Sequence, residues 1–78
     1  MEVDLILLLN GRIYPVEIKQ TATPMPRHAA SLTAFKRIAG EICKPGILVC
    51  TVSEIKSFPG GIKALPWKEF GTWIDSIV

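Results

Sequence analysis

Two runs of apolar residues near the start of the chain, 5–9 and 13–18, flank an Asn-Gly pair at residues 10–11. Asn-Gly between such runs is the strongest short-range signal for a β-hairpin with a two-residue loop. A loop of that length places Leu9 opposite Arg12 and fixes the register of the whole hairpin. The pattern therefore predicts that the fold begins with two antiparallel strands.

The predicted register brings charged residues together at the end of the hairpin away from the turn. Asp4 lies opposite Glu17 and Glu2 lies opposite Lys19, and alternation along each strand places all four side chains on one face. At an effective dielectric constant of about 20, two carboxylates roughly 5 Å apart repel each other by about 3 kcal/mol. Solvation, the Lys19 ammonium group or a bound divalent cation can offset that repulsion.

Apolar residues on both faces of the hairpin predict a sheet covered by helices on each side. The acids then lie at the rim of a buried sheet. Tyr14 is expected to face the core with its hydroxyl at the rim. The face that carries the charged residues also carries Ile6, Leu8, Ile13 and Pro15, and the other face carries Val3, Leu5, Leu7, Leu9, Tyr14, Val16 and Ile18.

The remaining pattern predicts one α/β domain over residues 1–78 with a mixed sheet and the order β-β-α-β-(β)-α. A helix over residues 27–41 followed by an apolar run at 47–52 predicts a parallel βαβ unit with the second hairpin strand. A short strand around 55–58 and a last strand at 62–65 precede a C-terminal helix. The first helix is expected to cover the sheet through Leu32, Phe35, Ile38, Ala39 and Ile42, and the last through Trp67, Phe70, Trp73, Ile74 and Ile77.

Composition places the chain among small globular domains, with 78 residues of which 49% are hydrophobic. The longest apolar run, residues 5–9, is far shorter than the roughly 20 residues of a membrane span, and no secretory signal pattern is visible. The cysteines lack metal-ligand spacing, and Cys50 in an apolar strand indicates a buried thiol in a reducing cytoplasm. A net charge of +2 is compatible with nucleic-acid binding without indicating it.

An Asp on one strand followed by Glu-x-Lys on the next resembles the motif of the PD-(D/E)XK, or restriction endonuclease-like, nuclease superfamily. Asp4 matches the first acid, and Glu17-Ile18-Lys19 matches the second half. The chain also resembles the uncharacterised domain found C-terminal to bacterial and archaeal AAA+-type ATPases, in which an EVDFxL strand precedes (I/V)E(I/V)K. That resemblance covers nearly all of the chain through residues 2–7 and 16–19, the helix with Leu32 and Phe35, the strand from Gly46 to Val52, and the ending Ala64-Leu65-Pro66-Trp67.

The resemblance implies a restriction endonuclease-like core and Mg²⁺- or Mn²⁺-dependent hydrolysis of nucleic-acid phosphodiesters. Asp4 and Glu17 would hold the metal ion, and Glu2 would add a ligand through water. Lys19 would orient the attacking water or stabilise charge on the phosphate. Residues expected to contact the nucleic-acid backbone are Gln20, Arg27 and His28.

The superfamily core normally has a helix and a strand ahead of the Asp-bearing strand, and this chain lacks both. The first strand is then an exposed edge. This predicts either a fragment of a larger ATPase-associated protein or a homodimer that completes the sheet through that edge. The alternative to a nuclease is therefore an inactive descendant of the fold that acts as an interaction or dimerisation module.

Each candidate residue also has a structural interpretation. The acids can be a solvated strand end with Glu2 and Lys19 as an ordinary cross-strand pair. The side chains of His28, Lys36 and Arg37 can belong to a solvated helix surface. The helical spacing of Trp67, Phe70 and Trp73 favours a place for these side chains in the core or an interface over a platform for stacking bases.

Overall fold

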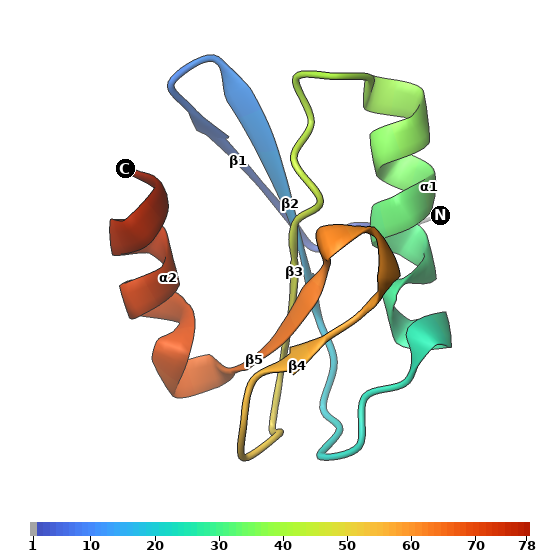
Figure 1. Ribbon diagram of the computed structural model, residues 1–78, viewed down its shortest axis with the longest axis vertical. Coiled ribbons are helices and arrows are strands. Elements are labelled where there is room, and N and C mark those ends of the chain that lie inside the picture. The colour runs from blue at the N-terminus through green and yellow to red at the C-terminus, as the bar shows by residue number, and fades with distance from the viewer. Residues whose placement is uncertain (1) are drawn as a thin grey trace.

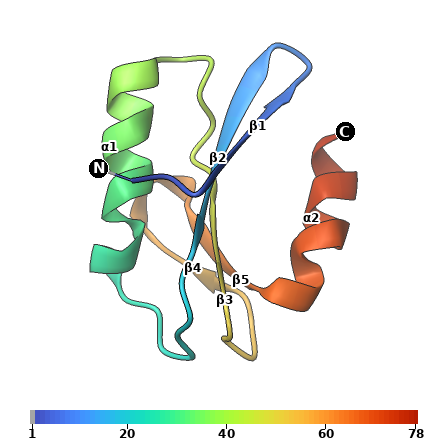
Figure 2. The ribbon, with the colours of Figure 1, turned by 180° about the vertical axis from the view of Figure 1, so that it is seen from behind.

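The computed structural model of the protein describes residues 2–78, and Met1, expected directly ahead of the first strand, lies outside the described residues. Figures 1 and 2 show a twisted sheet with one α-helix on each side. The strands are β1 (Leu5–Leu9), β2 (Arg12–Ile18), β3 (Ile47–Cys50), β4 (Lys56–Ser57) and β5 (Lys63–Pro66). The helices are α1 (Ala30–Ala39), which follows a 3₁₀ helix at Pro26–Ala29, and α2 (Phe70–Ile77), which follows one at Trp67–Glu69.

The strands β1 and β2 form the predicted antiparallel hairpin. Asn10 and Gly11 both have positive φ angles, 53° and 75°, as the two central residues of a type I′ turn require. The pairing runs from Leu9 opposite Arg12 to Leu5 opposite Val16. The predicted register is therefore confirmed throughout the ladder that forms.

The five strands lie in the order β1-β2-β3-β5-β4. The three central strands β2, β3 and β5 run parallel, whereas β1 and β4 pair antiparallel at the two edges. This confirms the parallel β2-α1-β3 unit and the position of β1 at an edge. Strands β4 and β5 form where the sequence predicts a short strand around 55–58 and a last strand at 62–65, although the order β-β-α-β-(β)-α includes only one of them.

Each helix covers a different face of the sheet, as predicted. On one face, Ala29 and Leu32 pack beside α1 against strand residues that include Leu48 and Ala64. On the other face, Phe70 and Trp73 of α2 pack on a cluster formed by Val16, Ile47, Val49 and Leu65. The rings of Phe70 and Trp73 stack at 5.8 Å.

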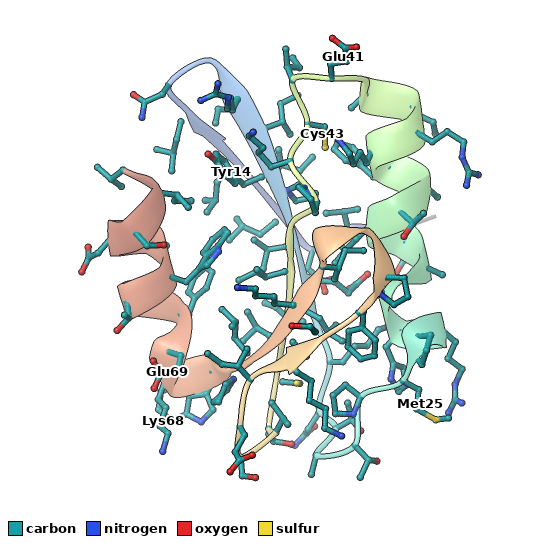
Figure 3. The ribbon with its side chains drawn as sticks, viewed as in Figure 1. Tyr14, Met25, Glu41, Cys43, Lys68 and Glu69 are labelled. Atoms are coloured by element: carbon teal, nitrogen blue, oxygen red, sulfur yellow. The ribbon has the colours of Figure 1, made fainter. Side chains whose placement is uncertain are left out.

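Tyr14 occupies the side of the hairpin that faces α2 (Figure 3). Its ring meets the edge of Trp73 at a centroid distance of 5.9 Å and an interplanar angle of 80°. The side chain is half-buried, in agreement with the predicted core-facing ring.

The inward face of α1 differs from the prediction. Ile38 and Ile42 are 73% and 54% exposed, so the expectation that they cover the sheet is wrong. Ile38 follows Leu32 by six residues, which turns it roughly 240° around the helix and away from the sheet. Lys36, one turn after Leu32, is half-buried instead of solvated, and its Nζ donates a hydrogen bond to the carbonyl of Cys43.

Gly46 allows β2 and β3 to approach each other. Its φ angle is +81°, and a Cβ atom there would lie 2.2 Å from the carbonyl oxygen of Pro15. Any other residue must push the two strands apart at this point. The close approach sets the parallel register that places Glu17 beside Leu48.

Both cysteines, Cys43 and Cys50, are buried free thiols, which confirms the prediction for Cys50. Within residues 2–78, none of the helices has the length and apolar character needed to cross a membrane.

Candidate functional site

The side chain of Asp4 ends the β1–β2 ladder. Its Oδ2 accepts a hydrogen bond from the backbone N–H of Ile18 at 2.7 Å. In the hairpin register this N–H would otherwise face the carbonyl of Val3. The carboxylate thus takes the place of a backbone acceptor, and β1 begins only at Leu5.

Because the ladder stops there, the predicted backbone pairs of Asp4 with Glu17 and of Glu2 with Lys19 do not form. The predicted meeting of the two acids nevertheless occurs, since the carboxyl groups of Asp4 and Glu17 lie near enough to shift each other's pKa in opposite directions. Lys19 lies close enough for its positive charge to act on both.

Glu17 is a buried acid on the α1 face of the sheet. Only 3% of its surface is exposed, and its neighbour across the β2–β3 ladder is Leu48. The pKa of Glu17 is raised from 4.5 to about 7, first because burial disfavours the charged carboxylate and then because Asp4 hydrogen-bonds to it and repels a second negative charge. Glu17 is therefore about half protonated at pH 7 and mostly protonated below it.

Asp4 is the ionised partner of this pair. Its pKa is lowered below the usual 3.8, first by the hydrogen bond with Glu17, then by the Ile18 N–H and the charge of Lys19. Two carboxyl groups in contact titrate as a unit and share one proton. Between the pKa values of Asp4 and Glu17, which means below about pH 7, the pair thus carries a single negative charge beside the Lys19 cation.

The pair supplies oxygen donors of the kind that Mg²⁺ and Mn²⁺ prefer, and Mg²⁺ commonly takes one or two protein carboxylates while keeping several waters. Asp4 and Glu17 fit that donor set once the shared proton leaves. Glu2 is exposed. Across residues 2–78, no three side chains of His, Cys, Asp or Glu come together as a group that could hold a metal ion.

The three residues expected to contact nucleic acid lie in different surroundings. The exposed Gln20 follows Lys19 at the carboxyl end of β2. Arg27 is exposed and donates from its guanidinium to the sulfur of Met25 at 3.0 Å. His28 is half-buried and accepts the Met25 backbone N–H on Nδ1 at 2.9 Å, which caps the 3₁₀ helix. His28 therefore has a structural partner already.

Two surface pockets differ in their relation to the acids. One of about 370 Å³ lies under α2 near the amino ends of β3 and β5, where Gly46, Lys63 and Trp73 line it. The other, of about 280 Å³, opens at the carboxyl ends of β2 and β3 and includes Lys19. Ligands of open α/β sheets bind at carboxyl strand ends, so the second pocket is the one associated with the candidate site.

Sequence analysis missed the role of Trp67 in this second pocket. The indole is 70% exposed and lines the pocket instead of packing in the core. The signal that could have located it is Pro66, which ends β5 opposite Cys50 and so places the next residue at the carboxyl end of a parallel strand.

Fold and site together define a small α/β domain whose hairpin presents a proton-sharing carboxyl pair beside a lysine. Residues 1–70 match the family described as a domain of unknown function, DUF4143, and the chain belongs to that family. No curated protein and no solved structure matches the chain.

Proposed function

We propose that this domain is a PD-(D/E)XK-like nuclease module that hydrolyses nucleic-acid phosphodiesters with Mg²⁺ or Mn²⁺. The observation that carries the proposal is the burial of Glu17 beside the carboxyl group of Asp4, with the charge of Lys19 acting on both. Burying the Glu17 carboxyl beside a second acid is costly, because it disfavours the charged form, and a site without chemistry has no physical reason to keep it.

Each residue of this site has a distinct task in the proposal. Asp4 and Glu17 hold the metal ion, which, when bound, polarises the phosphate and lowers the pKa of a bound water. Asp4 is held in place by the Ile18 N–H, so its carboxylate is oriented before any ligand arrives. Lys19 contributes positive charge where negative charge develops on the phosphate.

The observed arrangement of β1, β2, α1 and β3 supports a restriction endonuclease-like core, in which an acid-bearing hairpin is followed by a helix and a parallel strand. Association with an AAA+-type ATPase belongs to the same proposal and rests on the resemblance of the 2–7 and 16–19 segments.

Calorimetric titration with Mn²⁺ at pH 8 tests the metal site. The parent chain should bind, and both Asp4→Asn and Glu17→Gln should lose binding, because each removes a carboxylate while preserving shape and hydrogen bonding. Glu69→Gln, which alters a half-buried acid directly before α2, is the matched control and should bind like the parent (Figure 3). A folded parent that takes up no Mn²⁺ would exclude the proposed catalysis for this chain.

Cleavage assays on labelled DNA and RNA, single-stranded and duplex, test the activity itself. We expect Lys19→Ala to retain Mn²⁺ binding and lose cleavage by roughly 100-fold or more, as for removal of one stabilising donor. Loss of metal binding together with cleavage would instead make Lys19 a structural residue of the site.

A second candidate function is dimerisation, and the observation that favours it is the composition of the edge strand β1. Residues 5–9 carry no charge and no proline, the two devices that usually protect an exposed edge. Ile6 and Leu8 are 44% and 72% exposed on the face shared with α1. Such an edge is suited to pairing with another strand.

The register of the hairpin makes β1 self-complementary. A two-residue loop directs the backbone groups of Leu5, Leu7 and Leu9 toward β2, so those of Ile6 and Leu8 point outward. In an antiparallel pair with a second copy centred on Leu7, Ile6 of each chain meets Leu8 of the other. Their outward N–H and C=O groups are then satisfied and their exposed side chains join.

Sedimentation analysis over a range of concentrations tests this second function. The parent should form dimers, and Leu8→Lys should shift the population to monomers by placing like charges near the two-fold axis. Ile38→Lys, which alters an equally exposed residue on α1, should leave the dimer intact. A monomeric parent, or equal dimerisation of both variants, would refute pairing through β1.

A further inference from the structure

We propose that the pocket beneath Trp67 binds an unstacked nucleobase of a single-stranded nucleic acid. This inference deepens the proposed nuclease function and rests on it. The pocket is lined by Ile18, Lys19, Gln20, Val49, Cys50, Thr51 and Trp67.

The walls of the pocket offer the surfaces that a base requires. Trp67 exposes 70% of its surface and Ile18 exposes 56%, so an aromatic plane and an aliphatic side chain both border the opening. Stacking on an aromatic side chain tolerates every base, because each base has a π-face. A volume of about 280 Å³ suits a ring system better than an extended ligand.

The surface of the pocket is almost entirely apolar, and one cation lies at its border. Gln20 and Thr51 border the pocket, but its apolar surface means that a base is held there by stacking and not by hydrogen bonds to its edge. Lys19 is exposed beside them and complements the negative charge of a phosphate. The combination of an exposed aromatic residue and a bordering cation favours a nucleotide over an apolar peptide, which gains nothing from the lysine.

The backbone around the pocket is held in place before a ligand arrives. Beyond the end of the β2–β3 ladder, the Lys19 N–H donates to the Val49 carbonyl at 2.9 Å, and the Thr51 N–H donates to the Thr21 carbonyl at 3.0 Å. These bonds keep the two walls paired past their strands. A preformed pocket loses little conformational entropy on binding.

Lys19 joins this pocket to the acidic pair. It lines the pocket and its charge also acts on both Asp4 and Glu17. Glu17 lies on the α1 face of the sheet, and the next residue, Ile18, lies on the α2 face. The acidic pair and the pocket are therefore on opposite faces of the sheet at the end of β2. A strand of nucleic acid crossing this end can place a phosphate near the acids and a neighbouring base against Trp67.

Fluorescence anisotropy of a labelled thymidine 12-mer, measured in EDTA, tests the pocket without involving the metal site. The parent should bind, Trp67→Ala should weaken binding by roughly 5- to 150-fold, the range for one lost base stack, and Trp67→Phe should restore most of it. Trp67→Leu, which keeps apolar bulk without an aromatic face, should resemble Trp67→Ala. Ile38→Ala, an exposed apolar truncation on α1, is the control and should bind like the parent.

Equal binding by parent and Trp67→Ala, or no binding by the parent, would overturn the proposal. Preservation of binding in Trp67→Leu would also overturn it, since an apolar contact would then suffice. A Trp67-dependent self-association without oligonucleotide binding would assign the pocket to a second copy of the chain. Failure of Mn²⁺ binding with normal oligonucleotide binding would instead reject the metal site alone.

Discussion

The buried proton of Glu17 predicts an unusual dependence of stability on pH. In the unfolded chain the carboxyl ionises near 4.5, whereas in the folded chain it holds its proton up to about pH 7. Between these values the folded state binds more protons than the unfolded state, so the free energy of unfolding falls as pH rises. The contribution of Glu17 to stability is fully present below pH 4.5 and is lost above pH 7.

The size of this effect follows from the pKa difference. A change from 4.5 to about 7 at about 1.36 kcal/mol per pH unit corresponds to about 3 kcal/mol, most of which is lost between pH 5 and pH 8. Asp4 acts in the opposite direction, but its contribution to stability changes only below its usual pKa of 3.8. It is therefore constant between pH 5 and pH 8 and adds nothing to the pH dependence there. For a domain of marginal stability, a loss of this size is large.

Glu17→Gln isolates the effect, because glutamine imitates the protonated carboxyl and can still donate to Asp4. Urea unfolding of the parent at pH 5 and pH 8 should show a loss of about 2–3 kcal/mol in the free energy of unfolding, and Glu17→Gln should show none of it. Glu69→Gln should keep the slope of the parent. If Glu17→Gln and the parent changed equally with pH, the assigned protonation of Glu17 would be wrong.

Three further predictions use the same chain. Gly46→Ala should destabilise the protein by about 3 kcal/mol in urea unfolding, because the added Cβ meets a backbone oxygen at positive φ. Gly71→Ala, at an open position of α2, should stabilise it by about 0.5–1 kcal/mol. Equal effects of the two variants would contradict the close approach of β2 and β3. Leu32→Ala should lower the free energy of unfolding in urea by about 2–5 kcal/mol, and Ile38→Ala should lower it by under about 0.5 kcal/mol. Reversal of that order would refute the inward face assigned to α1. Mn²⁺ affinity measured by calorimetry should fall about tenfold from pH 8 to pH 6, since the metal must displace the proton of Glu17, and a flat profile would argue against that displacement.

The sequence by itself determined the local features of this protein. Asn10-Gly11 specified a turn with two positive φ angles, and that turn fixed the register that brings Asp4 to Glu17. The apolar run that starts at Ile47 specified a buried parallel strand. These predictions succeeded because a short-range conformational preference or a continuous apolar run was enough to set each of them.

Only the tertiary structure decided the properties that depend on several elements at once. Glu17 became a protonated acid because β3 and the α1 layer removed it from water, and no feature of its own strand sets that burial. The face that α1 turns inward depends on how the helix lies on the sheet, which left Ile38 exposed and drew Lys36 in. Trp67 has helical spacing with Phe70 but follows the end of β5 directly. The packing of the strand ends therefore left its indole open to solvent over a pocket.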